Sequence, residues 1–282
     1  MTITAREAAE IRAANESGRQ PVVFVHGLWL LAGSWDRWRA RFEERGFATV
    51  AVDWPDDPAT VAEAREHPEV FAGKGVGQVA DHVAEVIDRL ERTPVLVGHS
   101  FGGLLAQIVA GRGLAVASVA IDPAPSRGVL PLPVSSLRAS LPVLGNPRNR
   151  KRAVTLTFDE FRFGFASAVS EDEARRLYDE FHVAAPGRPL FQAATANLDP
   201  TTEAKADTRN PDRGPMLFVS GGADNIVPWR LSNAAYKRQR KNPNPTEIVE
   251  IDGRGHSLVF DSGWADVADV VLDFLDRHAV RA

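Results

Sequence analysis

The stretch VLVGHSFGGL, from Val95 to Leu104, places a serine between two glycines directly after a run of apolar, β-forming residues. The pattern Gly98-x-Ser100-x-Gly102 is typical of a sharp turn from a strand into a helix, because small residues on both sides let the two elements approach. Such a turn holds the Ser100 hydroxyl over the edge of a sheet, beside helix N–H groups that favour negative charge. We therefore interpret Ser100 as a candidate nucleophile.

On either side of this stretch, short apolar runs alternate with segments of helical periodicity, which indicates parallel β-α-β units. The runs are rich in Val and Ile, so we expect strands that are buried on both faces. The predicted strands are residues 21–27, 47–53, 93–99, 116–122, 215–222 and 246–253. The predicted helices are residues 34–45, 76–92, 100–112, 228–237 and 263–278. The expected fold is α/β, with a doubly wound, mostly parallel sheet of about six strands.

The alternation stops after Ile121 and resumes at Met216. The intervening segment is too long for a loop and contains helix-like stretches, such as the one that starts with the capping-box pattern of Ser170 and Glu173. We interpret it as a helical cap that is inserted after the fourth predicted strand. The predicted organisation is therefore an α/β core in two parts, residues 1–125 and 213–282, and a cap of residues 126–212.

Composition narrows the class of protein. A chain of 282 residues with 44% hydrophobic and 25% charged residues is expected to form one core with one insertion. A net charge of −4 argues against nucleic acid as the main partner, and we interpret the basic run that starts at Lys237 as a solvated surface. The absence of cysteine excludes thiolate catalysis and cysteine-bound metal. No apolar segment approaches the roughly 20 residues of a membrane span, and the N-terminus lacks the apolar stretch that a signal peptide requires. We therefore expect a soluble, cytoplasmic protein without a membrane partner.

A serine hydroxyl needs a base, and the base needs an acid that orients it. His256 lies just past the last predicted strand, in a loop with two glycines, and is our candidate base. The side chain of His99 should point away from Ser100. The remaining candidates fall away from the carboxyl ends of the strands and are interpreted as surface or packing residues: His67, His82, His182 and His278.

Two aspartates could be the orienting acid. Asp224 follows the strand before the last and is favoured, whereas Asp122 follows the preceding strand and could reach the same histidine. The developing oxyanion needs N–H donors, each worth about 3 kcal/mol. We expect these donors to be the amides of Phe101, directly after the serine, and of Leu28, in the loop after the first strand. His26 is expected to shape that loop rather than to react.

Four motifs in this order resemble the α/β-hydrolase family over most of the chain: HGLW from His26, GHSFGG from Gly98, GGADNIVP from Gly221 and GRGH from Gly253. The resemblance implies a triad of Ser100, Asp224 and His256, oxyanion donors at Leu28 and Phe101, a helical cap, and no cofactor or metal. Family members usually carry two further strands before the HG loop. Here about twenty residues precede it and look helical, so we expect a shortened sheet. A serine nucleophile disfavours the dehalogenase and epoxide-hydrolase branches, which use a carboxylate.

The inserted segment holds six of the fourteen phenylalanines, four of them in FDEFRFGF from Phe158. If Phe161 and Phe165 face the sheet, they line an apolar pocket together with Trp29 and Phe101; the same residues could instead form the core of the cap. The matching substrate is a small to medium, uncharged, moderately hydrophobic carboxylic ester or lactone. Alternatives are the same triad acting on another bond, as in a C–C hydrolase, amidase, lyase or cofactor-free haloperoxidase-like enzyme, and a receptor without catalysis. The oligomeric state is not predicted.

Overall fold

The computed structural model describes residues 2–281 and contains one six-stranded sheet with the strand order β2-β1-β3-β4-β7-β8. All its neighbouring strands are parallel. The strands are β1 (Pro21–Val25), β2 (Ala48–Val52), β3 (Val95–His99), β4 (Ala117–Ile121), β7 (Met216–Gly221) and β8 (Thr246–Ile251). The predicted α/β fold with a parallel sheet of about six strands is confirmed.

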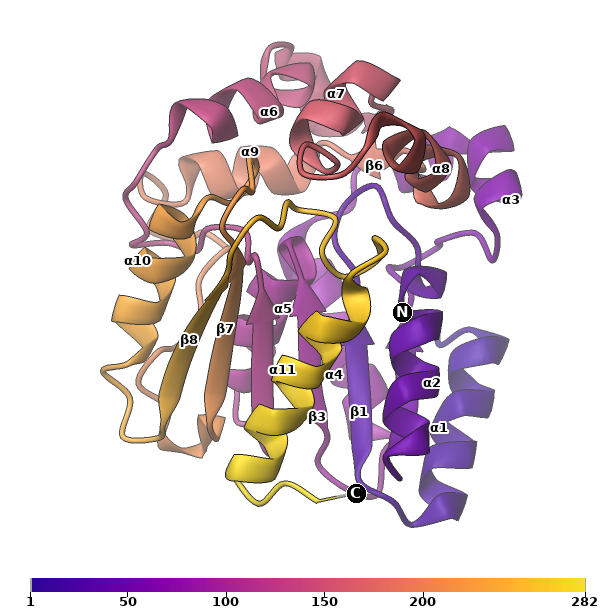
Figure 1. The fold of residues 1–282 in the computed structure, drawn as a ribbon, viewed down its shortest axis with the longest axis vertical. Coiled ribbons are helices and arrows are strands. Elements are labelled where there is room, and N and C mark those ends of the chain that lie inside the picture. Colours follow the sequence, from indigo (N-terminus) through magenta and orange to yellow (C-terminus); the bar gives the residue numbers. More distant parts are fainter. Residues whose placement is uncertain (1, 282) are drawn as a thin grey trace.

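Helices cover both faces of the sheet, so each central strand is buried on both sides. In Figure 1, α2 and α11 lie in front of the sheet, and α4 and α5 lie behind it. The helices of the core are α1 (Ala5–Ser17), α2 (Asp36–Glu44), α4 (Val76–Asp88), α5 (Phe101–Ala110), α10 (Trp229–Gln239) and α11 (Trp264–Arg277). Every residue of β1, β2, β3, β4 and β7 is buried, as the Val- and Ile-rich runs predict.

The N-terminal segment is a helix, as its sequence suggests. Thr4 and Glu7 form a capping box at the start of α1, and Gly18 ends the helix in the left-handed conformation. The helix covers the edge strand β2: the Glu10 carboxylate accepts a hydrogen bond from the N–H of Ala51 at 3.0 Å. Side chains of α1 therefore satisfy N–H groups that would otherwise be free at the edge of the sheet.

Short elements between β1 and β3 were not predicted. Residues 32–35 form the 3₁₀ helix η1 (Ala32–Trp35), so α2 starts at Asp36, two residues later than expected. The long connection after β2 contains α3 (Val61–Glu66) and η2 (Pro68–Phe71). These elements are too short for their periodicity to be recognised in the sequence.

The segment between β4 and β7 lies over the carboxyl ends of the strands, at the top of Figure 1. It is helical, with a two-stranded antiparallel sheet that the sequence did not predict. Its elements are α6 (Val134–Leu144), η3 (Pro147–Lys151), β5 (Ala153–Val154), α7 (Phe158–Gly164), α8 (Glu171–Phe181), β6 (Ala185–Pro186), α9 (Arg188–Thr195) and η4 (Pro211–Arg213). Within residues 2–281, no helix is both long enough and apolar enough to cross a membrane.

Candidate active site

The turn from β3 into α5 has the strained geometry that its sequence predicts. Ser100 has φ 58° and ψ −120°, a conformation that residues with a Cβ atom rarely adopt. A Cβ atom on Gly98 would lie 2.0 Å from the carbonyl oxygen of Gly102, and one on Gly102 would lie 1.9 Å from the carbonyl oxygen of Val25. Glycine at both positions therefore lets the strand, the turn and the neighbouring strand approach closely.

Ser100 lines a cavity of about 330 Å³ between the sheet and the inserted segment. Trp29 and Phe101 line the cavity beside Ser100, and Leu137 and Leu190 line it from the inserted segment. No charged side chain is among its lining residues. The cavity therefore suits an uncharged, apolar ligand.

His256 and Asp224 form a buried pair next to this turn. The Nδ1 atom of His256 lies 2.6 Å from Oδ2 of Asp224, and neither side chain is exposed. The other carboxylate oxygen of Asp224 accepts hydrogen bonds from the N–H groups of Ile226 at 2.6 Å and Val227 at 2.9 Å. A proton on Nδ1 leaves a lone pair on Nε2, which is buried and has no hydrogen-bond partner within residues 2–281.

His99 connects the loop of His256 to the serine turn. Its Nε2–H donates a hydrogen bond to the carbonyl oxygen of His256 at 2.9 Å, and the centres of the two rings are 4.6 Å apart. Burial, and then the adjacent His256, lower the pKa of His99 well below its usual range, so the ring is neutral. Because His99 directly precedes Ser100, this bond holds the loop of His256 beside the turn. This positioning contact of His99 was not predicted from its place next to Ser100.

No hydrogen bond joins Ser100 Oγ to His256 among the described residues. Catalytic hydrogen bonds are often long or poorly aligned in a free enzyme and form fully only in the complex with substrate. The position of the Asp224–His256 pair beside the turn is therefore the relevant geometry for a proton transfer from Ser100.

Asp122 lies beneath the same pair, but its contacts differ from those of Asp224. Its Oδ1 accepts a hydrogen bond from the N–H of Gly221 at 2.9 Å, and no hydrogen bond joins it to His256 within the described chain. Burial, and then the nearby charge of Asp224, raise the pKa of Asp122 well above its usual range. Of the two acids that the sequence left open, Asp224 is thus the one bonded to the imidazole.

One group of described residues could bring metal-ligand atoms together, namely His99, Asp122 and His256, whose atoms lie within 4.8 Å of one another. In this group the Nδ1 atom of His256 is already bonded to Asp224. A cation that used this atom would have to break that pair.

The loop after β1 lies against the serine turn. A Cβ atom on Gly27 would lie 2.7 Å from Cβ of Ser100, and Trp29 adopts a positive φ of 65°. The N–H groups of Leu28 and Phe101 have no protein acceptor among the described hydrogen bonds. Neither of the two predicted donors is therefore engaged by another acceptor in the described chain.

The amino-acid sequence itself places the chain among known proteins. A profile of the alpha/beta hydrolase family matches residues 22–270. The chain belongs to this family. Solved structures share its fold: the monoacylglycerol lipase of Paleococcus ferrophilus has a TM-score of 0.64 at 20% identity, over 92% of this chain and 94% of the lipase.

Two further hydrolases of this fold show how widely its activities range. A pyrethroid hydrolase from Sphingobium faniae has a TM-score of 0.62 at 16% identity and covers 91% of this chain and 97% of its own. A thermophilic esterase from Thermogutta terrifontis has a TM-score of 0.61 at 18% identity and covers 92% of this chain and 90% of its own. Identities this low establish the common fold and leave the substrate to be argued from the site itself.

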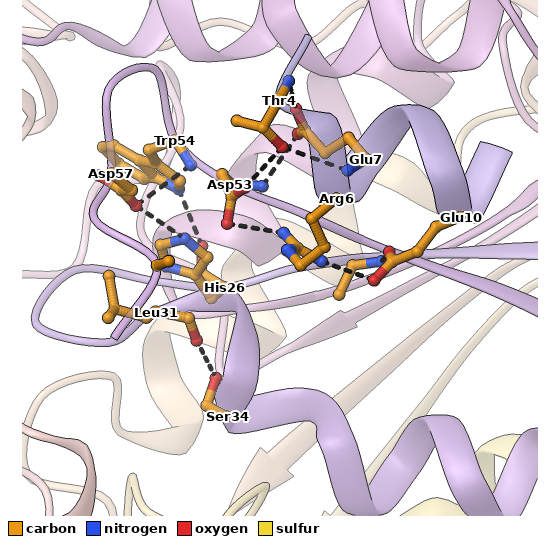
Figure 2. A network of polar contacts seen from close by, with 12 residues as sticks. Thr4, Arg6, Glu7, Glu10, His26, Leu31, Ser34, Asp53, Trp54 and Asp57 are labelled. Atoms are coloured by element: carbon orange, nitrogen blue, oxygen red, sulfur yellow. Dashed lines mark hydrogen bonds and ion pairs between the residues drawn. The ribbon is translucent and has the colours of Figure 1, made fainter. Parts of the chain in front are cut away.

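In this alpha/beta hydrolase, buried polar contacts fix the HG loop (Figure 2). His26 donates from Nδ1 to the carbonyl oxygen of Gly27 at 2.8 Å, and its Nε2 lies 3.2 Å from Oδ2 of Asp57. The indole N–H of Trp54 donates to the carbonyl oxygen of His26 at 3.2 Å. On its other side, Asp57 pairs with Lys74 at 3.2 Å. Neither Asp57 nor Lys74 was predicted, because both lie in loops without a motif.

The four aromatic residues expected at the pocket divide into two groups. Trp29 and Phe101 line the cavity, but Phe161 and Phe165 are fully buried and are not among its lining residues, which corrects the expectation for these two. Phe165 packs edge-on against the ring of His256, with centres 5.0 Å apart, and Phe161 stacks on Phe165 at 5.1 Å. The two rings therefore support the imidazole instead of contacting a ligand.

Proposed function

We propose that this chain is a carboxylic ester hydrolase that acts on small to medium, uncharged, moderately hydrophobic esters or lactones through an acyl-enzyme on Ser100. The observation that carries the proposal is the buried Asp224–His256 pair beside a strained serine turn that opens into a cavity without charged side chains. Names of structural neighbours, monoacylglycerol lipase and esterase, agree with ester chemistry.

In the proposed mechanism, Nε2 of His256 accepts the proton of Ser100 Oγ while Oγ attacks the ester carbonyl carbon. The N–H groups of Leu28 and Phe101 bind the oxyanion of the tetrahedral intermediate. Asp224 stabilises the imidazolium and keeps the Nδ1 proton in place. When the C–O bond breaks, the alcohol takes the proton from Nε2 and the acyl group stays on Ser100.

Water completes the cycle. His256 accepts a proton from a water molecule, the hydroxide attacks the acyl carbon, and the same N–H groups bind the second oxyanion. Ser100 recovers its proton from His256 as the acid leaves. The segment 126–212 acts in this proposal as a cap that covers the acyl group and keeps bulk water out.

Labelling and substrate profiling test the proposal together. A fluorophosphonate should label the wild-type protein and leave Ser100→Ala unlabelled, because it reacts with an activated serine. p-Nitrophenyl esters should then be turned over faster than matched amides and diketones. An unlabelled wild type would favour a receptor, and rapid diketone cleavage without ester turnover would favour a C–C hydrolase.

A further inference from the structure

Exposed apolar side chains gather at one place on the molecule. Within residues 2–281, seven large hydrophobic residues are exposed, and the one that lies elsewhere is Val116. The other six border the mouth of the cavity and are here called the rim patch: Leu130, Leu132, Val134, Leu137, Leu141 and Leu198. Three of them, Leu130, Leu132 and Leu137, also line the cavity. Single exposed apolar residues are ordinary, but a contiguous group at a cavity mouth marks an interaction surface.

Helix α6 presents its apolar stripe to solvent. Val134, Leu137 and Leu141 have the i, i+3, i+7 spacing of one helix face, which in most surface helices faces the core. Here Val134 is 81% exposed and Leu141 is 61% exposed, and within α6 the one buried residue is Val143. The helix lies at the outer end of the molecule, at the top of Figure 1. No other described part of the chain covers this face.

Leu198 belongs to the same surface although it is distant in sequence. The side chain of Asn197 donates to the carbonyl oxygen of Val129 at 2.9 Å and accepts from the N–H of Gly128 at 2.6 Å. These two bonds fix the loop that leads to α6 beside Leu198, which is 85% exposed. The patch therefore surrounds the mouth from two sides.

A run of exposed cations borders the rim patch. This basic run comprises Arg148, Arg150, Lys151 and Arg152. The side chain of Asn149, within the run, donates to the carbonyl oxygens of Pro142 and Val143, both at 3.1 Å, and so fixes the run at the end of α6. Asp199 follows Leu198 in the sequence, and its pKa is lowered by hydrogen bonds from Thr201 and, to a smaller degree, by the nearby charges of Arg127 and Arg150. Because Arg150 belongs to the basic run, the run also lies near Leu198.

The cations of the basic run are available to an outside partner. None of the four forms an ion pair within the part of the chain that the structure describes, although the whole chain has a net charge of −4. Asp159 and Glu160 line a groove along α6 together with Arg138, and Asp199 follows Leu198 in the sequence. An anionic partner is therefore favoured at the end of α6 that carries the basic run.

We propose that the rim patch and the basic run together form a docking surface for an anionic lipid bilayer. The apolar side chains enter the boundary between head groups and acyl chains, and the cations face the lipid phosphates. The expectation of no membrane partner rested on the absence of a spanning segment, which a protein that lies on a bilayer does not need. If the proposed function also holds, the cavity mouth faces the lipid, and an apolar ester reaches Ser100 without crossing water.

Co-sedimentation with vesicles tests the docking surface without any turnover. Ser100→Ala protein is mixed with vesicles of phosphatidylglycerol and phosphatidylcholine, or of phosphatidylcholine alone. We expect stronger binding to the anionic vesicles, weakened at 1 M salt, where the Debye length falls to about 3 Å. The rim variant Val134→Ser/Leu141→Ser/Leu198→Ser should bind the anionic vesicles at least about tenfold more weakly. The basic-run variant Arg148→Gln/Arg150→Gln/Lys151→Gln should show a similar loss.

Matched controls distinguish binding through this surface from nonspecific adsorption to vesicles. Val116→Ser removes the exposed apolar side chain outside the patch, and Lys237→Gln/Lys241→Gln removes charge from the other basic run; both should bind like the parent protein. None of the residues changed in the rim variant lines the cavity. When the same three substitutions are made in protein that retains Ser100, the turnover of a water-soluble ester should therefore be unchanged.

Three results would overturn the docking proposal. They are no vesicle binding by the parent protein, unchanged binding by the folded rim variant, and equal losses in the control variants. If binding by the rim variant is unchanged while its turnover falls, the patch serves substrate entry alone. Vesicle binding without any ester turnover would instead reject the proposed function and leave the docking surface standing.

Discussion

The Asp224 carboxylate lies 2.6 Å from the Nδ1 atom of His256, and both side chains are fully buried. Two backbone N–H groups hold the other oxygen of Asp224, so the carboxylate cannot rotate freely. The imidazole is therefore oriented before any substrate binds, with its Nε2 lone pair available for a proton.

Replacing Asp224 with Asn should reduce kcat by about 10³- to 10⁴-fold. The amide can no longer accept the Nδ1 proton in the same geometry, and the ring then favours the tautomer with the proton on Nε2. Initial rates with a water-soluble p-nitrophenyl ester measure the effect, and circular dichroism checks that the variant is folded.

Asp122→Asn is the matched control. Oδ1 of Asp122 accepts the N–H of Gly221, and burial raises the pKa of this carboxyl well above its usual range, so an amide of the same shape can keep this hydrogen bond. We expect kcat within about threefold of wild type. A crippled Asp122→Asn together with a nearly active Asp224→Asn would reverse the assignment of the acid.

The backbone approach at the serine turn predicts a large stability effect. Gly102→Ala places a methyl group 1.9 Å from the carbonyl oxygen of Val25, where a backbone has to move, so the free energy of unfolding should fall by more than about 4 kcal/mol. Gly33→Ala is the control, since its nearest neighbour is an Asp36 side-chain oxygen at 3.7 Å. Urea unfolding of both variants gives the comparison. A loss below about 1 kcal/mol in Gly102→Ala would contradict the close approach.

Residues at the ends of strands were predictable from the sequence, because a parallel sheet brings the carboxyl ends of its strands to one edge. Ser100, Asp224 and His256 each follow an apolar run within a recognisable motif. The end of each apolar run indicates where the strand ends. The parallel sheet of about six strands followed from the same alternation of apolar runs and helical segments, whereas the order of its strands was not predicted.

Other parts of the site depend on packing between segments that are distant in sequence. The helical spacing of Phe161 and Phe165 shows that they share a face, but it does not tell whether that face meets a cavity or His256. The stripe of α6 has the pattern of a buried face and yet lies in solvent. Asp57 and Lys74 meet His26 through loops whose course has no periodic signal.

His182 predicts a loss of stability in acid. It is buried in the inserted segment, where its Nε2 accepts a hydrogen bond from the N–H of Leu156 at 3.3 Å. Burial, and then Arg65, lower the pKa of His182 to about 3, whereas an unfolded histidine has a pKa of about 6.5. Between these values the unfolded chain binds the proton and the folded chain does not, so this contribution is complete above pH 6.5 and is lost as the pH falls towards 3.

The slope from His182 should approach 1.4 kcal/mol, at about 25 °C, for each pH unit below 6. Urea unfolding at pH 7, 6 and 5 measures it, with His182→Gln as the variant that cannot titrate. The difference in slope between the two proteins isolates this residue from the other buried histidines. Parallel slopes would mean that His182 is protonated in the folded state.

The contacts of Glu7 predict that helix α1 contributes strongly to stability (Figure 2). This buried carboxylate accepts hydrogen bonds from the N–H groups of Thr4 at 2.8 Å and Asp53 at 3.1 Å. It also lies 3.0 Å from Nε2 of His82. Burial raises its pKa, but the hydrogen bonds from His82 and Thr4 outweigh this, and the net pKa is lowered. Glu7 is therefore ionised and serves as the common acceptor of three groups.

Glu7→Ala should lower the free energy of unfolding by about 3 to 5 kcal/mol, because it leaves His82 and the N–H of Asp53 buried without their acceptor. Glu16→Ala, at an exposed position of the same helix, should change it by less than about 0.5 kcal/mol. Amide hydrogen exchange adds a local measure: the N–H groups of Ala51 and Asp53 should exchange faster in Glu7→Ala, since α1 then leaves the edge of β2 more often. Unchanged exchange at both amides would show that α1 stays attached to β2 through its other contacts.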